Sequence, residues 1–233
     1  MLRKTPLTSG ETYHIYNRGA HKFATFTDDS DYWRFSALLH LANHTGPVLL
    51  GELLERKKLR GRFSGEIFTE PADKALVAVL AYALMPNHFH LVIRQKVDNG
   101  ITRFMQKVAV SYSMYFNTKY EHSGVLFQGR FKSSHLGTDP YFKWIFPYVH
   151  LNPVSLVESD WQEKGISDPA RARDFLKNYR HSSYYDYYVG ERSERAILAY
   201  DEAVDLLDGE DDIQRMLVAY GKGKAIYSDL SAV

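Results

Sequence analysis

The sequence predicts an α+β protein in which a mainly antiparallel sheet carries helices on one face and a helical extension follows at the C-terminus. Two apolar runs, residues 76–84 and 88–94, flank a Pro-Asn pair and indicate a strand, a tight turn and a second strand. Residues 99–120 place apolar side chains at helical spacing. The expected order is strand, helix, strand, strand, helix, strand, helix, for which an antiparallel sheet is the simplest arrangement.

The first elements follow from local patterns. Residues 11–18 alternate loosely and end before a glycine, which indicates a strand. Residues 27–43 repeat apolar side chains at helical spacing and begin with Thr-Asp-Asp, a typical helix start. Residues 46–72 are less regular and contain a basic cluster at 56–62, so we interpret residues 47–75 as an insertion between core elements.

The later elements are predicted in the same way. Residues 125–136 read as a strand that carries Arg130 and Lys132. A helix is expected to begin at Asp139, a good N-cap before a proline, and to stop at Asn152, because the proline that follows disfavours helical geometry there. The C-terminal extension, residues 158–233, is expected to contain helices near 192–207 and 211–220.

Composition limits the class of protein. The 233 residues include no cysteine, which excludes disulfides, thiolate zinc sites and cysteine nucleophiles and suits a reducing cytoplasm. No apolar run reaches the length of a membrane span, so no membrane association is expected. The net charge is only +1, but basic residues are clustered and 17 tyrosines are present, a combination that suits single-stranded nucleic acid and equally an ordinary charged surface.

Four residues suggest chemistry. His88 and His90 are two apart on a predicted strand, so both imidazoles project from one face and can bind a divalent metal. Tyr148 and Asn152 are four apart on a predicted helix and share a face. A phenol oxygen can attack phosphorus when a metal polarises the phosphate, and the Asn152 amide can supply a third ligand, a set that suits Mn²⁺ or Mg²⁺.

Each of these patterns also has a structural interpretation. A histidine on a strand often only completes a hydrogen-bond network, and a tyrosine beside apolar helical residues usually packs in a core. Asparagine before proline is an ordinary helix stop. The combination of the two pairs favours chemistry over packing.

Three segments in this order carry a family resemblance: Leu-Met-Pro-Asn-His-Phe-His-Leu at 84–91, Gly-Val-Leu-Phe-Gln-Gly-Arg-Phe-Lys at 124–132 and Tyr-Val-His-Leu-Asn-Pro at 148–153. Together they resemble the single-tyrosine HUH transposases of insertion sequences, and most of all the REP-associated tyrosine transposases. The resemblance covers roughly residues 10–157 of a domain expected at residues 1–157. It implies a ferredoxin-like core and a transposase that cleaves and rejoins single-stranded DNA hairpins.

The resemblance also implies roles for individual residues. His88 and His90 match the paired metal ligands, Tyr148 the nucleophile that forms a 5′-phosphotyrosine, and Asn152 a third amide ligand for Mg²⁺ or Mn²⁺. Such an enzyme acts in the cytoplasm at the nucleoid, as a monomer or a homodimer. One departure from the pattern is Pro147, which precedes Tyr148 inside the helix and is expected to kink it.

Further residues are candidates for DNA contact. Arg130 and Lys132 are expected to alternate on one strand face, and Arg18 follows the first strand. Arg180 and Tyr184 lie in a segment that mixes basic and aromatic residues and can stack unpaired bases. Two alternatives to the transposase remain: a domesticated protein that binds DNA hairpins without cutting them, and an unrelated metallohydrolase.

Overall fold

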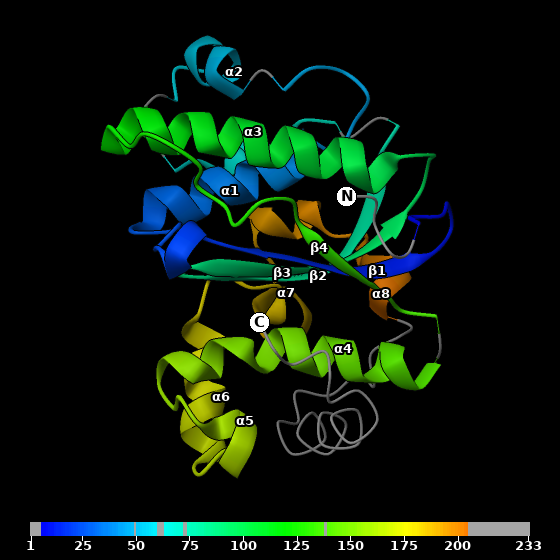
Figure 1. The fold of residues 1–233 in the computed structure, drawn as a ribbon, viewed down its shortest axis with the longest axis vertical. Coiled ribbons are helices and arrows are strands. Elements are labelled where there is room, and N and C mark those ends of the chain that lie inside the picture. Colours follow the sequence, from blue (N-terminus) through cyan, green and yellow to red (C-terminus); the bar gives the residue numbers. More distant parts are fainter. Residues whose placement is uncertain (1–5, 49, 60–62, 72–73, 138, 205–233) are drawn as a thin grey trace.

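The structure is a computed structural model that describes residues 6–48, 50–59, 63–71, 74–137 and 139–204, with the backbone alone for residues 139–143. A four-stranded antiparallel sheet forms its centre, and helices lie on both sides of the sheet (Figure 1). Within the described residues, no helix combines the length and the apolar character needed to cross a bilayer.

The sheet consists of β1 (Thr12–Arg18), β2 (Val77–Met85), β3 (His88–Gln95) and β4 (Lys132–His135). The strands lie in the order β2-β3-β1-β4 and every neighbouring pair is antiparallel. With one helix after β1 and another after β3, this is the β-α-β-β-α-β arrangement of ferredoxin-like folds. The predicted α+β class and antiparallel sheet are therefore confirmed. The N-terminal strand lies in the interior of the sheet, between β3 and β4.

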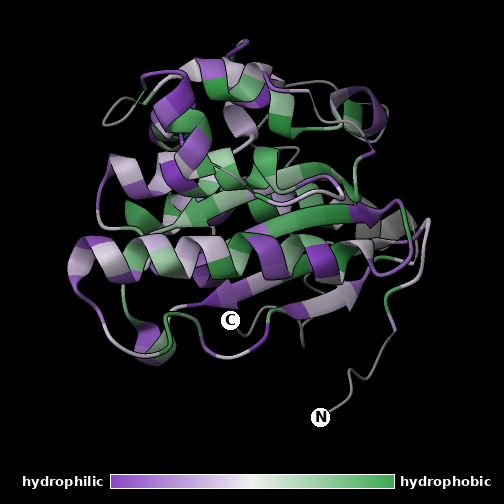
Figure 2. Ribbon diagram, turned by 90° about the horizontal axis from the view of Figure 1, so that it is seen from above, coloured by the Kyte–Doolittle hydropathy of each residue, from purple (hydrophilic) through white to green (hydrophobic). Residues whose placement is uncertain are grey.

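The two core helices cover one face, as predicted. They are α1 (Asp29–Leu41) and α3 (Gly100–Tyr120). Helix α1 begins at Asp28, whose side chain accepts hydrogen bonds from the backbone of Ser30 and Asp31 and completes a capping box. Their apolar sides bury one continuous core with the odd-numbered residues of β1 and β3. In Figure 2 the outer helices carry both hydrophilic and hydrophobic residues, as expected for amphipathic helices around a core.

The opposite face is also covered, which corrects the expectation of helices on one face only. Helix α4 (Asp139–Leu151) packs there against the sheet, on the side away from α1 and α3 (Figure 1). The reason lies in β2, all nine residues of which are buried. A strand buried on both faces is a continuous apolar run without polar alternation, and it needs a layer on each side.

The C-terminal extension is built differently from the prediction. It comprises α5 (Trp161–Lys164), α6 (Pro169–Asn178), α7 (Tyr184–Tyr188), η4 (Ser193–Ile197) and α8 (Tyr200–Val204). The helix expected at 192–207 is thus two short helices, and the one expected at 211–220 lies outside the described residues. The extension hydrogen-bonds the outer edge of β2, where Leu84 N donates to His181 O and Ser183 N donates to Tyr82 O. This contact covers an otherwise open strand edge.

The segment at residues 47–75 adds to the core, and the last strand is shorter than predicted. Residues 47–75 contain α2 (Leu50–Arg56) and η2 (Gly65–Thr69), which add leucines and Phe68 to the core on the α1 side. The strand predicted at 125–136 is shorter: β4 begins only at Lys132, and before it Phe127 makes a single bridge to Gly19. The remaining short helices are η1 (Ala20–Lys22) and η3 (Asn152–Leu156).

Candidate active site between the sheet and helix α4

The histidine pair lies at the start of β3. His88 is half-buried and His90 is buried, with ring centroids 5.0 Å apart, while Phe89 between them packs in the core on the α1 side. A tight turn at Pro86 and Asn87 joins β2 to β3 and fixes where the strand begins. Alternation along a strand therefore brings both imidazoles to the face that α4 covers.

Helix α4 brings the other two predicted residues to the same place. The Tyr148 ring lies edge-on to His90 at 5.3 Å between centroids and stacks on Trp144 at 4.9 Å. Asn152 follows the last residue of α4; its Nδ2 donates to the Tyr148 carbonyl at 3.3 Å, and its side chain lies near enough to His88 to affect the pKa of that ring. The helix continues through Pro147, so the proline does not end it before the tyrosine.

Two residues that the sequence analysis did not single out contact the histidines. The Nε2 atom of His14, on β1, lies 2.9 Å from Nδ1 of His90, with the rings stacked at 16°. The Nδ1 atom of His88 lies 2.7 Å from Oδ1 of Asn87. Because an amide oxygen only accepts, the neutral His88 ring holds its proton on Nδ1 and its lone pair on Nε2. The sequence could have indicated Asn87, because it directly precedes His88. It gave no such indication for His14, which is 76 residues from His90.

Burial keeps these imidazoles neutral. It lowers the pKa of His88 to about 4, with a further contribution from the charge of Arg18, and it lowers the pKa of His14 to about 3. The pKa of His90 is also lowered, first by burial and then by His88 and His14. At neutral pH each ring therefore carries one proton and one lone pair, the form in which histidine binds a metal.

The donor set fits a divalent metal that keeps open positions. In the part of the chain that the structure describes, no three His, Cys, Asp or Glu side chains gather as a metal cage. The available donors are two imidazoles, on His88 and His90, and the amide of Asn152. The Nδ1 atom of each histidine is occupied by a neighbour, an outer-shell arrangement typical of metal-binding histidines. Two imidazoles and an amide leave room for substrate oxygens.

Basic residues flank this site at the ends of β1 and β4. Lys132 is exposed, and its Nζ lies 5.8 Å from the centre of the Tyr16 ring, which is on the same sheet face as His14. Arg18, half-buried at the end of β1, lies close enough to affect His88. Arg130 does not share a strand face with Lys132, which corrects the prediction. It precedes β4 and lines a hollow of about 460 Å³ on the α3 side of the sheet.

The predicted aromatic and basic segment lies elsewhere, along the outer edge of β2. Arg180 is exposed, and its guanidinium carbon lies 4.0 Å from the centre of the Tyr185 ring. Tyr184 is fully buried, so its ring has no free face on which a base can stack. The expectation for Tyr184 is therefore wrong in this structure, because the ring belongs to the core under α4.

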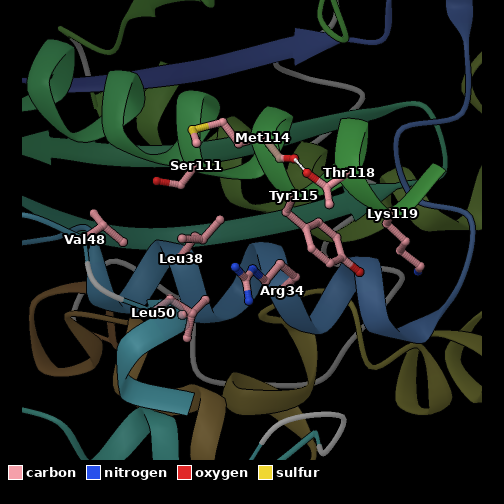
Figure 3. Close-up of a pocket in the computed structure, with 10 residues that line it drawn as sticks. Arg34, Leu38, Val48, Leu50, Ser111, Met114, Tyr115, Thr118 and Lys119 are labelled. Atoms are coloured by element: carbon pink, nitrogen blue, oxygen red, sulfur yellow. Dashed lines mark hydrogen bonds between the residues drawn. The ribbon is translucent and has the colours of Figure 1, made fainter. Parts of the chain in front are cut away.

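Cavity size alone does not locate the site. A hollow of about 530 Å³ lies between α1, α2 and α3, where Arg34 is surrounded by Leu38, Leu50 and Tyr115 (Figure 3). It is on the opposite side of the sheet from His88 and His90, and none of the predicted site residues lines it. Chemistry and geometry together therefore point to the face under α4.

A protein-family comparison covers this region of the chain. Residues 52–152 match the family model described as "Transposase IS200 like". The matched region contains both histidines, Tyr148 and Asn152, but not β1. Among solved structures, one described as "Structure of the REP associates tyrosine transposase bound to a REP hairpin" is similar over 80% of this chain and 84% of that chain, at 11% identity and a TM-score of 0.46. No curated protein matches the chain.

Proposed function

We propose that this chain, which carries the IS200-like transposase region in residues 52–152, is a metal-dependent endonuclease and strand transferase for single-stranded DNA hairpins. The observation that carries the proposal is the convergence of two elements. Strand β3 supplies His88 and His90, and helix α4 supplies Tyr148 with its ring 5.3 Å from that of His90. A nucleophile and a pair of metal donors thus occupy one buried layer.

Tyr148 is assigned the role of nucleophile. Its phenol oxygen attacks the scissile phosphorus, the bond from phosphorus to the 3′ oxygen breaks, and the phenol proton is released. The departing 3′ oxygen becomes a hydroxyl by taking up that proton, so the products are a 5′-phosphotyrosine and a strand with a free 3′ hydroxyl. Because this ester retains the energy of the phosphodiester, a 3′ hydroxyl can reverse the step and join strands without ATP.

His88 and His90 are assigned to hold the metal through Nε2, with the amide of Asn152 beside them. When bound, Mn²⁺ or Mg²⁺ supplies a Lewis acid that polarises a non-bridging phosphate oxygen. Burial keeps both rings neutral, and the contacts of their Nδ1 atoms with His14 and Asn87 orient them. Tyr148 is 2% exposed, so its side chain lies in the layer between the sheet and α4.

Basic residues are assigned to the DNA backbone. Lys132 and Arg18 flank the site and are placed to neutralise phosphates on either side of the scissile bond. Arg130 lines a hollow on the α3 side of the sheet and Arg180 lies against Tyr185, and we assign both to more distant phosphates of the hairpin.

The test is a denaturing gel of purified protein, Mn²⁺ and a labelled library of hairpins with single-stranded flanks. Wild-type protein is expected to give a slow-migrating covalent adduct that Tyr148→Phe lacks. Tyr112→Phe is the matched control, because Tyr112 is equally buried but lies on α3, across the sheet. An adduct that persists in Tyr148→Phe would refute the assignment.

A second candidate is hairpin binding without cleavage. It is favoured by Pro147 directly before Tyr148 and by the near-complete burial of that phenol. In that case neither wild type nor variant gives an adduct, while hairpins still shift on a native gel. Restoration of the adduct by Pro147→Ala would then show that the proline blocks the reaction.

A further inference from the structure

We propose that His14 is a positioning residue that directs the Nε2 atom of His90 toward the divalent metal. The inference rests on the proposed function, in which His90 is a metal ligand. It begins from a contact between two central strands: the Nε2 atom of His14 lies 2.9 Å from Nδ1 of His90, and their ring centroids are 5.1 Å apart. Both rings are buried.

Strand register makes this contact rigid. Strands β1 and β3 pair with Tyr16 opposite His90 and His14 opposite Val92. His14 is therefore the diagonal neighbour of His90 on the same sheet face, within reach of a side-chain hydrogen bond. Since β1 is also paired with β4 and β3 is also paired with β2, both strands lie in the interior of the sheet.

The positions of the ring protons decide which nitrogen of His90 can bind a metal. A neutral imidazole has one N–H group and one lone pair, so one ring donates and the other accepts. If His14 donated, the proton of His90 would sit on Nε2 and that atom could not bind a metal. If Nδ1–H of His90 donates, His14 accepts at Nε2, holds its own proton on Nδ1, and leaves the Nε2 lone pair of His90 available. Only the second arrangement is compatible with metal binding.

In His88, as in His90, Nδ1 carries the proton and Nε2 keeps its lone pair. The Nδ1–H of His88 donates to Oδ1 of Asn87, and the Nδ2 of Asn87 donates to the Lys22 carbonyl, which holds the amide in that orientation. The two histidines thus offer the same nitrogen, one directed by a neighbour in the turn and the other by a residue on β1. The Tyr148 ring lies edge-on to both His14 and His90, at 5.5 and 5.3 Å, so the pair also supports the nucleophile.

The first test reads the protonation of the rings directly. Long-range ¹⁵N–¹H NMR of metal-free protein is expected to show His90 and His14 both protonated on Nδ1, with assignments from single histidine variants. A His90 ring protonated on Nε2 would overturn the proposal. This measurement needs neither DNA nor cleavage, so it remains informative if the proposed reaction fails.

The second test measures Mn²⁺ affinity by EPR titration. His14→Leu is expected to weaken binding roughly 10- to 100-fold, the usual effect of losing an outer-shell partner. His14→Gln, whose amide oxygen can accept the bond, should restore affinity to within about 3-fold of wild type, which a merely structural role would not predict. His150→Leu is the matched control, because His150 is equally buried but bonds Ser183 instead.

The outcomes separate the two proposals. Equal affinity of the wild type and the His14→Leu protein would overturn the role of His14 while leaving the metal site intact. Absence of Mn²⁺ binding by wild-type protein would overturn the metal-dependent function itself. Circular dichroism of each variant establishes that the fold is retained, and His14→Gln serves if the leucine protein does not fold.

Discussion

Buried neutral histidines should make this fold sensitive to mild acid. Four of them, His14, His88, His150 and His181, have their pKa lowered by burial to about 3, 4, 3 and 4 from an ordinary 6.5, and burial also lowers the pKa of a fifth, His90. In the unfolded chain the same rings take up protons as the pH falls through 6.5. Between about pH 6.5 and pH 4 the unfolded state therefore binds more protons than the folded state, and stability falls as the pH falls.

The magnitude depends little on the precise pKa values. At about pH 5.5 an unfolded histidine is roughly 90% protonated while a ring with a folded pKa near 4 is almost entirely neutral, which costs about 1.4 kcal/mol for each ring. Five rings together cost about 7 kcal/mol. That is a large share of the roughly 5–15 kcal/mol by which a typical domain is stable.

The assay is urea unfolding followed by circular dichroism at about pH 7.5 and about pH 5.5, with EDTA present so that metal binding does not contribute. The free energy of unfolding is expected to fall by about 7 kcal/mol between the two pH values. In His150→Gln the fall should shrink by about 1.4 kcal/mol, because one titrating ring is gone. An equal fall in wild type and variant, or no fall in either, would refute the assignment of neutral rings.

Three further predictions concern binding and stability. Lys132→Ala removes one positive charge and should weaken the binding of single-stranded DNA, as measured by fluorescence anisotropy. The slope of log affinity against log salt concentration should become shallower by about 1, the effect of losing one phosphate contact. The Mn²⁺ affinity should change less than about 2-fold between pH 7 and pH 5.5, because His88 and His90 are already deprotonated, whereas ordinary histidines would lose roughly 10-fold each. Arg192→Met should cost about 3–5 kcal/mol of unfolding free energy, because it leaves the buried carboxylate of Asp186 unpaired.

Matched controls exist for two of these. Lys164 is exposed on α5, away from the site, and Lys164→Ala should leave DNA binding unchanged. Arg195 pairs with Glu191 at the surface, so Arg195→Met should change stability by less than about 1 kcal/mol. An equal loss of stability in the Arg192 and Arg195 variants would show that burial of the first pair is not what matters.

Local patterns predicted which candidate side chains share a face, because these residues lie on regular elements. Alternation along a strand placed His88 and His90 on one face, and helical spacing placed Tyr148 and Asn152 on another. The core strands and the two long helices were likewise visible as periodic apolar runs. These features depend only on residues within a few positions of each other, which a single sequence contains.

What the sequence could not reveal depends on pairing between distant segments. The contact of His14 with His90 requires the register of β1 on β3, which no local pattern encodes. The burial of Tyr184 depends on α7 packing under α4, and a run of tyrosines and charges reads as surface until that layer is placed. The second helical layer was missed for a related reason. All residues of β2 are buried, so its sequence has no alternation of polar and apolar residues from which a layer on a particular face could be predicted.

The strand order explains why the N-terminal segment belongs to the site. The family match begins at residue 52, yet β1 lies between β3 and β4 and contributes His14, Tyr16 and Arg18 to the face under α4. A chain that began at residue 52 would leave the inner edge of β3 unpaired and the Nδ1 atom of His90 without its partner. Since both β3 and β4 pair with β1, the histidine strand and the lysine strand hold their relative positions only through it. The geometry that we assign to catalysis is therefore a property of the whole sheet and cannot be attributed to the matched region alone.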